Sequence, residues 1–303
     1  MVKMRGDDPR VNLIGFGQIP KVSRFGDFAI RVLAPNPSPM TLDGTNTYIL
    51  RSSQGAFIVD PGPSIGEHLK LVEEVLKSEG LGVVGVLLTH SHFDHSEAAK
   101  SWSHHFDAPT YGASGVGGVR LISEGSRFDC GDLSITVLET PGHTGDHLAF
   151  LTNDGALLTG DHVLGRGTSV VAHPDGNLSS YIRSILRLFD IEKKIALPGH
   201  GPEIVGERID EVLSFYLGHR KARIDQLIEF LSGGEADVHE IVEQIYGDSI
   251  SKNLKFAAEL STLAALTTLR DRGFLIEEED RYRLVSAASA FSFESVFSIR
   301  GAN

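Results

Sequence analysis

The sequence contains little cysteine, no long apolar run and no excess of positive charge, and each of these absences excludes a class of protein. There is a single cysteine among 303 residues, Cys130, so no disulfide can form within the chain. This usage is typical of a reducing compartment. Cys130 has no CxxC partner, and we expect it to be a small buried side chain and not a reactive thiol.

Membrane insertion and export are not indicated either. No apolar run approaches the roughly 20 residues that cross a bilayer. The N-terminal residues 1–21 lack the apolar stretch of a secretory signal, and their pair of aspartates is unlike a transit peptide. We therefore expect a cytoplasmic location and no membrane partner.

The charge balance is acidic. Lys and Arg number 28 against 40 Asp and Glu, which gives a net charge of −12. Affinity for nucleic acid depends largely on basic residues that neutralise phosphates, so the composition weighs against a polyanionic partner. A local basic groove could still hold one, and bound divalent cations would offset part of the negative charge.

The length favours one large and one small domain, because 303 residues exceed a comfortable single core. An apolar fraction of 41% with 22% charged residues is ordinary for a globular protein. We predict a larger domain over residues 25–206, a helical domain over 207–285, and a tail, 286–303, whose structure we leave open.

Within the larger domain, short apolar segments that end at Gly, Pro or Asp alternate with helical patterns. The predicted strands are Asp27–Ala34, Thr47–Arg51, Gly55–Asp60, Val83–Thr89, Leu133–Glu139, His147–Thr152, Ala156–Thr159 and Lys194–Leu197. Helices are predicted over Ser64–Ser78 and Ser179–Phe189, with Ser64 and Ser179 as N-caps. This mixture predicts an α/β sandwich in which helices cover the sheets.

The sequence pattern changes after residue 206, from alternating strands and helices to consecutive helices. Helical patterns cover Asp210–Leu231, Val238–Tyr246 and Leu254–Arg272, and the segment Phe274–Val285 has the pattern of a β-hairpin. Three helices followed by a hairpin predict a winged-helix-like unit.

One motif dominates the larger domain. The segment His90–His95, HSHFDH, directly follows an apolar strand and places four potential metal ligands within six residues. Imidazole and carboxylate groups suit borderline cations such as zinc, and a loop at a strand end lets alternate side chains converge. The motif therefore predicts a metal site.

Three further potential ligands follow predicted strands beside a glycine, namely His143, Asp161 and His200. Glycine permits tight turns and close approach of the backbone to a ligand. A lone histidine after a strand is usually a surface or satisfied core residue, but four such elements indicate one edge of a sandwich organised around metal.

The other histidines carry weaker signals. We expect His104 and His105 to be solvated, and His68, His219 and His239 to lie on the outer faces of helices. His147 and His162 neighbour potential ligands, and His173 could line the cleft. For these three a supporting or substrate-binding role is an alternative to a purely structural one.

The ordered motifs resemble the metallo-β-lactamase superfamily, whose pattern runs Asp, HxHxDH, His, Asp, His. The resemblance implies an αββα sandwich with a dinuclear site at one edge, and Asp60 matches the structural aspartate of the first motif. It also implies a ligand set: His90, His92 and His143 for one metal, Asp94, His95 and His200 for the other, and Asp161 as the bridge. We expect two zinc ions, with iron or manganese as alternatives.

The flanks resemble the β-lactamase-like protein 2 group, which carries a C-terminal winged helix. The matching segments are Pro35–Pro39, PNPSP, and Gly44–Tyr48, GTNTY. Asp161 argues against β-lactam hydrolysis, because true β-lactamases generally have cysteine or serine at the bridging position. The histidine at His92, where flavodiiron proteins carry Glu, argues against that branch, and the interval between Asp161 and His200 is too short for the inserted domain of the β-CASP nucleases.

The resemblance implies hydrolysis by a hydroxide that bridges the two metals, with Asp94 orienting it or moving a proton to the leaving group. We favour a small ester, thioester or lactone as substrate. Single-stranded RNA is the alternative, because some members of the β-lactamase-like protein 2 group cleave it. Against RNA, residues 219–285 hold 9 Lys and Arg and 13 Asp and Glu, whereas nucleic-acid readers usually show a basic footprint. The C-terminal domain could instead cap the cleft or form a homodimer.

Overall fold

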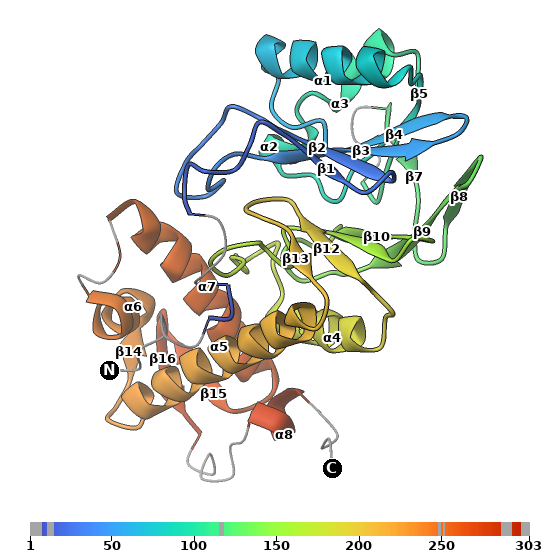
Figure 1. Cartoon of the computed structure of the whole chain (residues 1–303). Helices are drawn as coiled ribbons and strands as arrows, with labels where there is room; N and C mark the ends of the chain where they lie inside the picture. The colour runs from blue at the N-terminus through green and yellow to red at the C-terminus, as the bar shows by residue number, and fades with distance from the viewer. Residues whose placement is uncertain are drawn as a thin grey trace.

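The computed structural model describes residues 8–10, 15–114, 118–247, 250, 252–285 and 293–297. Two sheets face one another in its centre, as Figure 1 shows. The first sheet contains, in spatial order, β1 (Val22–Phe25), β2 (Ala29–Leu33), β3 (Asn46–Ser52), β4 (Gly55–Val59), β5 (Val83–Leu87), β6 (Thr110–Gly112) and β7 (Arg120–Leu121). The second contains β13 (Ile204–Val205), β12 (Ile195–Pro198), β11 (Ala156–Gly160), β10 (Leu148–Thr152), β9 (Leu133–Glu139) and β8 (Arg127–Cys130).

Helices cover the outer faces of both sheets. α1 (Gly66–Glu79) and α3 (Ala99–His105) lie over the first sheet, and α4 (Leu178–Phe189) and α5 (Arg208–Leu231) lie under the second (Figure 1). Each sheet is mixed: β4 and β5 are parallel, as are β11 and β12, whereas the hairpins β2–β3 and β9–β10 are antiparallel. The predicted αββα sandwich is therefore confirmed.

Apolar side chains fill the space between the sheets. This inner cluster includes Tyr48, Leu50, Leu87, Val137, Phe150 and Leu158, none more than 2% exposed. Cys130 lies at its margin, 8% exposed, as predicted for a small buried side chain. Burial at about 25 cal/mol per Å² of apolar surface is the main force that holds the two sheets face to face.

Both helix N-caps were predicted wrongly. α1 begins after Ile65, which makes no side-chain capping bond, and Ser64 lies one residue further out. α4 begins after Asn177, whose side chain accepts a hydrogen bond from the backbone N–H of Ser180, so Ser179 already lies inside the first turn. Asn caps as well as Ser does, and the sequence offered both within three residues.

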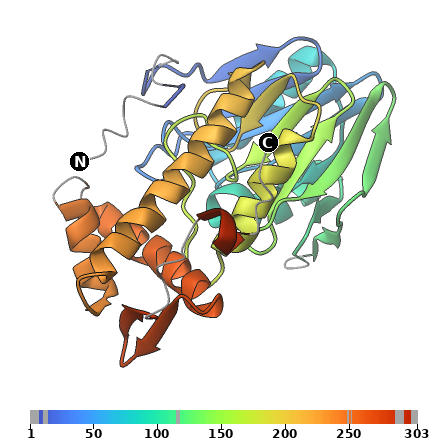
Figure 2. The same cartoon turned by 90° about the horizontal axis from the view of Figure 1, so that it is seen from below.

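The C-terminal part contains α6 (Val238–Tyr246), α7 (Lys252–Asp271) and a small sheet of β14 (Ala236–Asp237), β16 (Arg281–Leu284) and β15 (Leu275–Glu278). Figure 2 shows α5 running from the sandwich into this part. One hydrophobic cluster joins α4 to α5, α6 and α7, with Ile185, Tyr216, Ile241 and Leu266 fully buried in it. The hairpin lies where it was expected, whereas the domain boundaries and the winged-helix assignment stay predictions.

Part of the predicted tail is described. α8 (Phe293–Phe297) buries Phe293, Val296 and Phe297 in the same cluster, and residues 286–292 and 298–303 lie outside the described residues. Among the described helices, none combines the length and the apolar character needed to cross a bilayer.

Candidate metal centre

The potential ligands come from the ends of four strands. The HSHFDH segment follows β5 and enters the short helix α2 (Phe93–Ser96). His143 lies in the turn between β9 and β10, Asp161 follows β11, and His200 follows β12. Because these strands end at the same edge of the sandwich, residues up to 110 positions apart in the sequence meet there.

The first histidine group consists of His90, His92 and His143. One ring nitrogen from each lies within 4.8 Å of the other two. Nε2 of His143 lies 3.0 Å from Nδ1 of His92, and Nδ1 of His143 is 2.6 Å from the carbonyl oxygen of Val170. Since the Val170 carbonyl accepts a hydrogen bond from the Nδ1–H group, Nε2 of His143 is left with its lone pair directed at its neighbours.

The second group consists of Asp94, His95 and His200, which also offer atoms within 4.8 Å of one another. Nε2 of His95 lies 3.3 Å from Nε2 of His200, and Oδ2 of Asp94 lies 3.1 Å from the latter. Nδ1 of His200 is 3.1 Å from the carbonyl oxygen of Gly44. As in the first group, the outer ring nitrogen is bonded to the protein and the inner one faces the cluster.

Asp161 lies between the groups. Its Oδ2 is 3.8 Å from Nε2 of His143 and 3.4 Å from Nε2 of His200, and its Oδ1 is 3.3 Å from Nε2 of His95. Oδ1 is buried and makes no hydrogen bond in the part of the chain that the structure describes, as is also true of Nε2 of His90. Buried polar atoms normally have a partner, so these two facing a shared space fit a cation between them.

The charges of the cluster fit a cation as well. Burial opposes a proton on His95 and on His200, but Asp161 and the other carboxylates outweigh it and raise the pKa of His95 well above its usual value and that of His200 to about 9. In the first group burial dominates and lowers the pKa of His90, and that of His143 to about 4. The cluster thus attracts positive charge on one side and offers neutral imidazoles on the other, which is what metal ligation requires.

The comparisons with known proteins agree with this geometry. The family model described as the metallo-beta-lactamase superfamily matches residues 40–119. A "Beta-lactamase-like protein 2 homolog" from Drosophila melanogaster is 30% identical over 277 residues, which cover 85% of this chain and 92% of that protein. The chain belongs to the metallo-beta-lactamase superfamily.

Two further matches are informative. An "Atrochrysone carboxyl ACP thioesterase" from Pseudocercospora fijiensis is 31% identical over 246 residues, 78% of this chain and 73% of that protein. The solved structure of a beta-lactamase domain protein from Burkholderia ambifaria superposes with a TM-score of 0.79 at 22% identity, covering 94% of this chain and 99% of that one, and so supports the fold. This metallo-beta-lactamase superfamily member is accordingly a metal-dependent hydrolase.

In this superfamily member Asp60, the aspartate of the first motif, orients His95 of the second group through the outer nitrogen of its ring. Its Oδ2 lies 2.8 Å from Nδ1 of His95, and both its oxygens accept hydrogen bonds from Thr89, at 2.7 and 2.8 Å. Asp60 has a φ of 51°, a left-handed backbone conformation that Asp tolerates better than most residues. The sequence indicated Asp60 only through the family resemblance, and it gave no signal for Thr89.

Close packing fixes the turn that carries His143. Gly142 has a φ of 141°, and a Cβ placed on it would lie 2.2 Å from Cα of Tyr181 in α4. Only glycine avoids this clash, because real Cβ atoms essentially never approach another heavy atom within 3.0 Å. The glycine beside His143 is therefore a positional requirement, as its place in the motif suggested.

The remaining histidines divide unevenly. His68, expected on a helix surface, is only 1% exposed, and its Nε2 lies 2.8 Å from Oγ1 of Thr47, so that prediction was wrong. His104, His105 and His239 are exposed, as predicted.

His147 stacks on His90 with ring centroids 5.2 Å apart, and His162 is fully buried behind His147. His219 is half-buried, and His173 is half-buried and not among the grouped potential ligands.

Proposed function

We propose that the protein is a dinuclear zinc hydrolase that acts on a small ester, thioester or lactone. The first histidine group and the second group would each hold one ion, and Asp161 would bridge them. The proposed ligands are His90, His92, His143, Asp161, Asp94, His95 and His200. The observation that carries the proposal is the position of Asp161, whose oxygens lie within 3.8 Å of histidine nitrogens in both groups.

Ions bound in such a site supply Lewis acidity and lower the pKa of a bound water to about 7. The chain itself supplies orientation and proton transfer. Asp94 has a side chain 29% exposed, against 12% for Asp161, so it is the carboxylate of the cluster that a substrate can best approach. Burial alone would raise its pKa, but His95 and the hydrogen bond to His200 outweigh burial and lower the pKa, so Asp94 is ionised and able to accept a proton.

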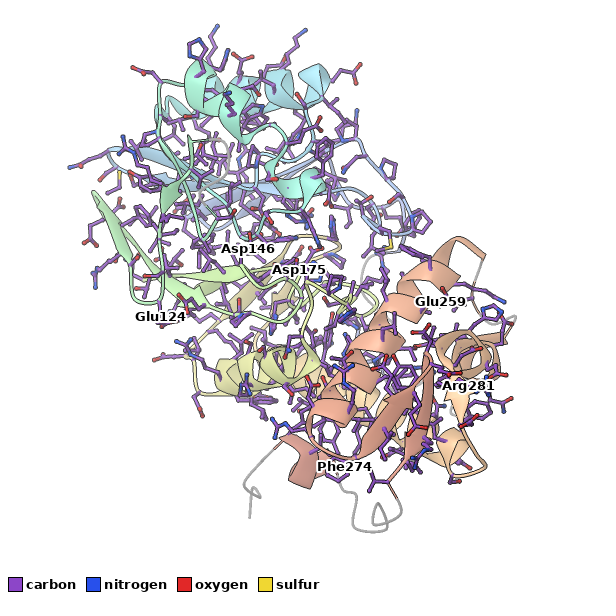
Figure 3. The ribbon with its side chains drawn as sticks, turned by 180° about the vertical axis from the view of Figure 1, so that it is seen from behind. Glu124, Asp146, Asp175, Glu259, Phe274 and Arg281 are labelled. Atoms are coloured by element: carbon purple, nitrogen blue, oxygen red, sulfur yellow. The ribbon has the colours of Figure 1, made fainter. Side chains whose placement is uncertain are left out.

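The surroundings of the cluster favour an acyl substrate. Phe93 stands between two potential ligands in the sequence and is 70% exposed, so its ring is an apolar surface that an acyl group could contact. Near the turn of His143, Asp146 and Asp175 lie close together, and Asp175 accepts a hydrogen bond from the backbone of Gly145 (Figure 3). Carboxylates at this position would repel a phosphodiester chain, and one relative is named as an ACP thioesterase.

A matched substrate panel tests the proposal. The zinc-loaded protein would be assayed with acyl thioesters, lactones, phosphodiesters and single-stranded RNA, beside Asp94→Ala and a control, Asp132→Ala, whose exposed carboxylate lies at the turn between β8 and β9. We expect thioester or ester cleavage that falls at least about 100-fold in Asp94→Ala and is unchanged in the control. Efficient RNA cleavage that Asp94→Ala abolishes, with no acyl cleavage, would replace the acyl substrate by RNA.

A further inference from the structure

A small cavity lies between the sandwich and the C-terminal helices. Its volume is about 30 Å³, and its wall combines Val171, from the segment before α4, with Arg220 and Arg223 of α5 and Ser261 and Thr262 of α7. A water-sized atom needs roughly 10–15 Å³ of such space, so about two fit. Two such atoms match the two oxygens of a carboxylate, or two of the oxygens of a phosphate group.

Among the residues that the structure describes, no carboxylate neutralises the two arginines. Arg220 donates a hydrogen bond from Nη2 to the carbonyl oxygen of Ser169, and Arg223 donates a hydrogen bond from Nη1 to the side chain of Gln226. The Nε of each is buried without a partner, and within the described ranges of the chain neither guanidinium forms an ion pair with a carboxylate. The described residues that line the cavity include no Asp or Glu.

The contrast with the other buried arginines is direct. Arg31, 1% exposed, pairs with Glu203 at 3.1 Å, and Arg10, 3% exposed, pairs with Asp8 at 2.7 Å. Arg220, 8% exposed, has no such ion pair with a carboxylate among the described residues. A buried charge without a counter-ion is costly, so the exception at Arg220 requires an explanation.

The local field around these arginines is positive. Burial, followed by Arg220, Arg223 and Arg10, lowers the pKa of His219 to about 3, so this histidine is neutral and adds no further charge. Each cavity arginine lies over a tyrosine ring, with Cζ of Arg220 4.9 Å from the ring centroid of Tyr181 and Cζ of Arg223 4.5 Å from that of Tyr246. Such cation–π contacts help to hold a guanidinium in place, and its N–H groups remain the donors that recognise an oxyanion.

We propose that this cavity binds a small oxyanion with the chemistry of a phosphate or carboxylate group, held by Arg220, Arg223 and the hydroxyls of α7. A purely structural role for the hydrogen bond between Arg220 and Ser169 would not explain why Arg223 also lines the cavity, because the hydrogen bond of Arg223 to Gln226 lies within α5. The site adjoins the metal centre, because Val171 follows the residue whose carbonyl orients His143. The anion is either part of a substrate or free in solution.

Thermal unfolding of the metal-free protein tests the site, since phosphate then has no metal to bind. Inorganic phosphate should raise the melting temperature in a saturable way, above sodium chloride at equal ionic strength. In Arg223→Met the dissociation constant should rise at least about tenfold. Lys221→Met, which removes one exposed positive charge from the same helix, should leave it unchanged. In case Arg223→Met does not fold, Ala265→Met fills the cavity from α7 without removing charge and should also abolish the effect.

Two results would overturn the site: no stabilisation by phosphate beyond that of chloride, or an equal loss in Lys221→Met, which would show only general screening. A kinetic arm, which depends on the proposed function, separates the sources of the anion. If phosphate raises KM for a phosphate-bearing thioester and not for a phosphate-free one, the anion belongs to the substrate. If it changes kcat for both alike, the anion is free. Because the binding experiment uses no substrate, its outcome is independent of whether the proposed function holds.

Discussion

The carboxylate of Asp60 lies 2.8 Å from Nδ1 of His95 and is only 2% exposed. Asp60 follows β4, whereas His95 lies in α2, so the parallel pairing of β4 with β5 brings the two together. The bond holds the proton of His95 on Nδ1 and leaves Nε2 as the atom that faces Asp94, Asp161 and His200. Asp60 therefore sets the tautomer and the orientation of a central member of the cluster without joining it.

Asp60→Asn tests this role. The amide removes the negative charge behind the imidazole, so zinc affinity of the second group should fall about 10- to 100-fold while the first group changes little. Chelator competition measures the zinc affinities of both groups. Asp210→Asn, at an exposed position in the first turn of α5, is the control. Unaltered zinc affinity in Asp60→Asn would show that Asp60 serves only to position the backbone of Thr89.

Gly142→Ala should be strongly destabilising, because its methyl group would have to displace the backbone of α4 at Tyr181. We expect a loss of unfolding free energy of about 3 kcal/mol or more, together with weaker zinc binding at His143. Chemical denaturation measures the first and chelator competition the second. The control is Gly145→Ala in the same turn, where the nearest atom, Oδ1 of Asp175, would lie at an ordinary 3.5 Å. Equal stability of the two variants would contradict the packing argument.

His68 predicts a pH dependence of stability. Burial lowers its pKa to about 4 from the ordinary histidine value of 6.5, so the folded protein holds it neutral. The unfolded chain then binds the proton first, and stability should be complete above about pH 6.5 and decline as the pH falls toward 4, by about 3 kcal/mol. The measurement is the unfolding free energy of metal-free protein against pH, as the difference between wild type and His68→Gln. A difference that is constant from pH 7 to pH 4 would refute the assignment.

Much of this fold could be predicted from patterns because central strands such as β3, β4 and β11 are buried over most of their length. β9 and α6 have the predicted bounds, and the predicted strand at 83–89 is two residues longer than β5. The short strands β1, β6, β7, β8, β13 and β14 were missed, since segments of four or fewer residues carry little periodic signal. The helical pattern of α1 also did not predict that His68 is buried, because its contact with Thr47 is not encoded in the spacing of neighbouring residues.

The cluster shows the same limit. Placement at strand ends was enough to predict that His90, His143 and His200 are neighbours, because ligands at strand ends share an edge. Supporting groups such as Val170 and Gly44 act through backbone carbonyls, which leave no trace in residue type. Nor could Arg220 be found, since its role depends on how α5 crosses the second sheet.

Phe93 offers a test of substrate class. If its exposed ring contacts the acyl group, Phe93→Ala should raise KM for long-chain thioesters about fivefold or more and change KM for an acetyl thioester little, with kcat preserved. Val205→Ala, which shortens another exposed apolar side chain on the edge strand β13, should change neither. Steady-state kinetics over a series of chain lengths measures the effect, and a uniform change across the series would remove Phe93 from the substrate contact.

The most direct test of the proposed dinuclear centre is the metal content of purified protein, measured by elemental analysis together with activity. We expect two zinc ions per chain in the wild type. Asp161→Asn should hold one or fewer and lose at least about 100-fold in kcat, because it weakens the one carboxylate that reaches both groups. A fully active wild type with one ion or none, or an Asp161→Asn variant that keeps both ions and full activity, would contradict it.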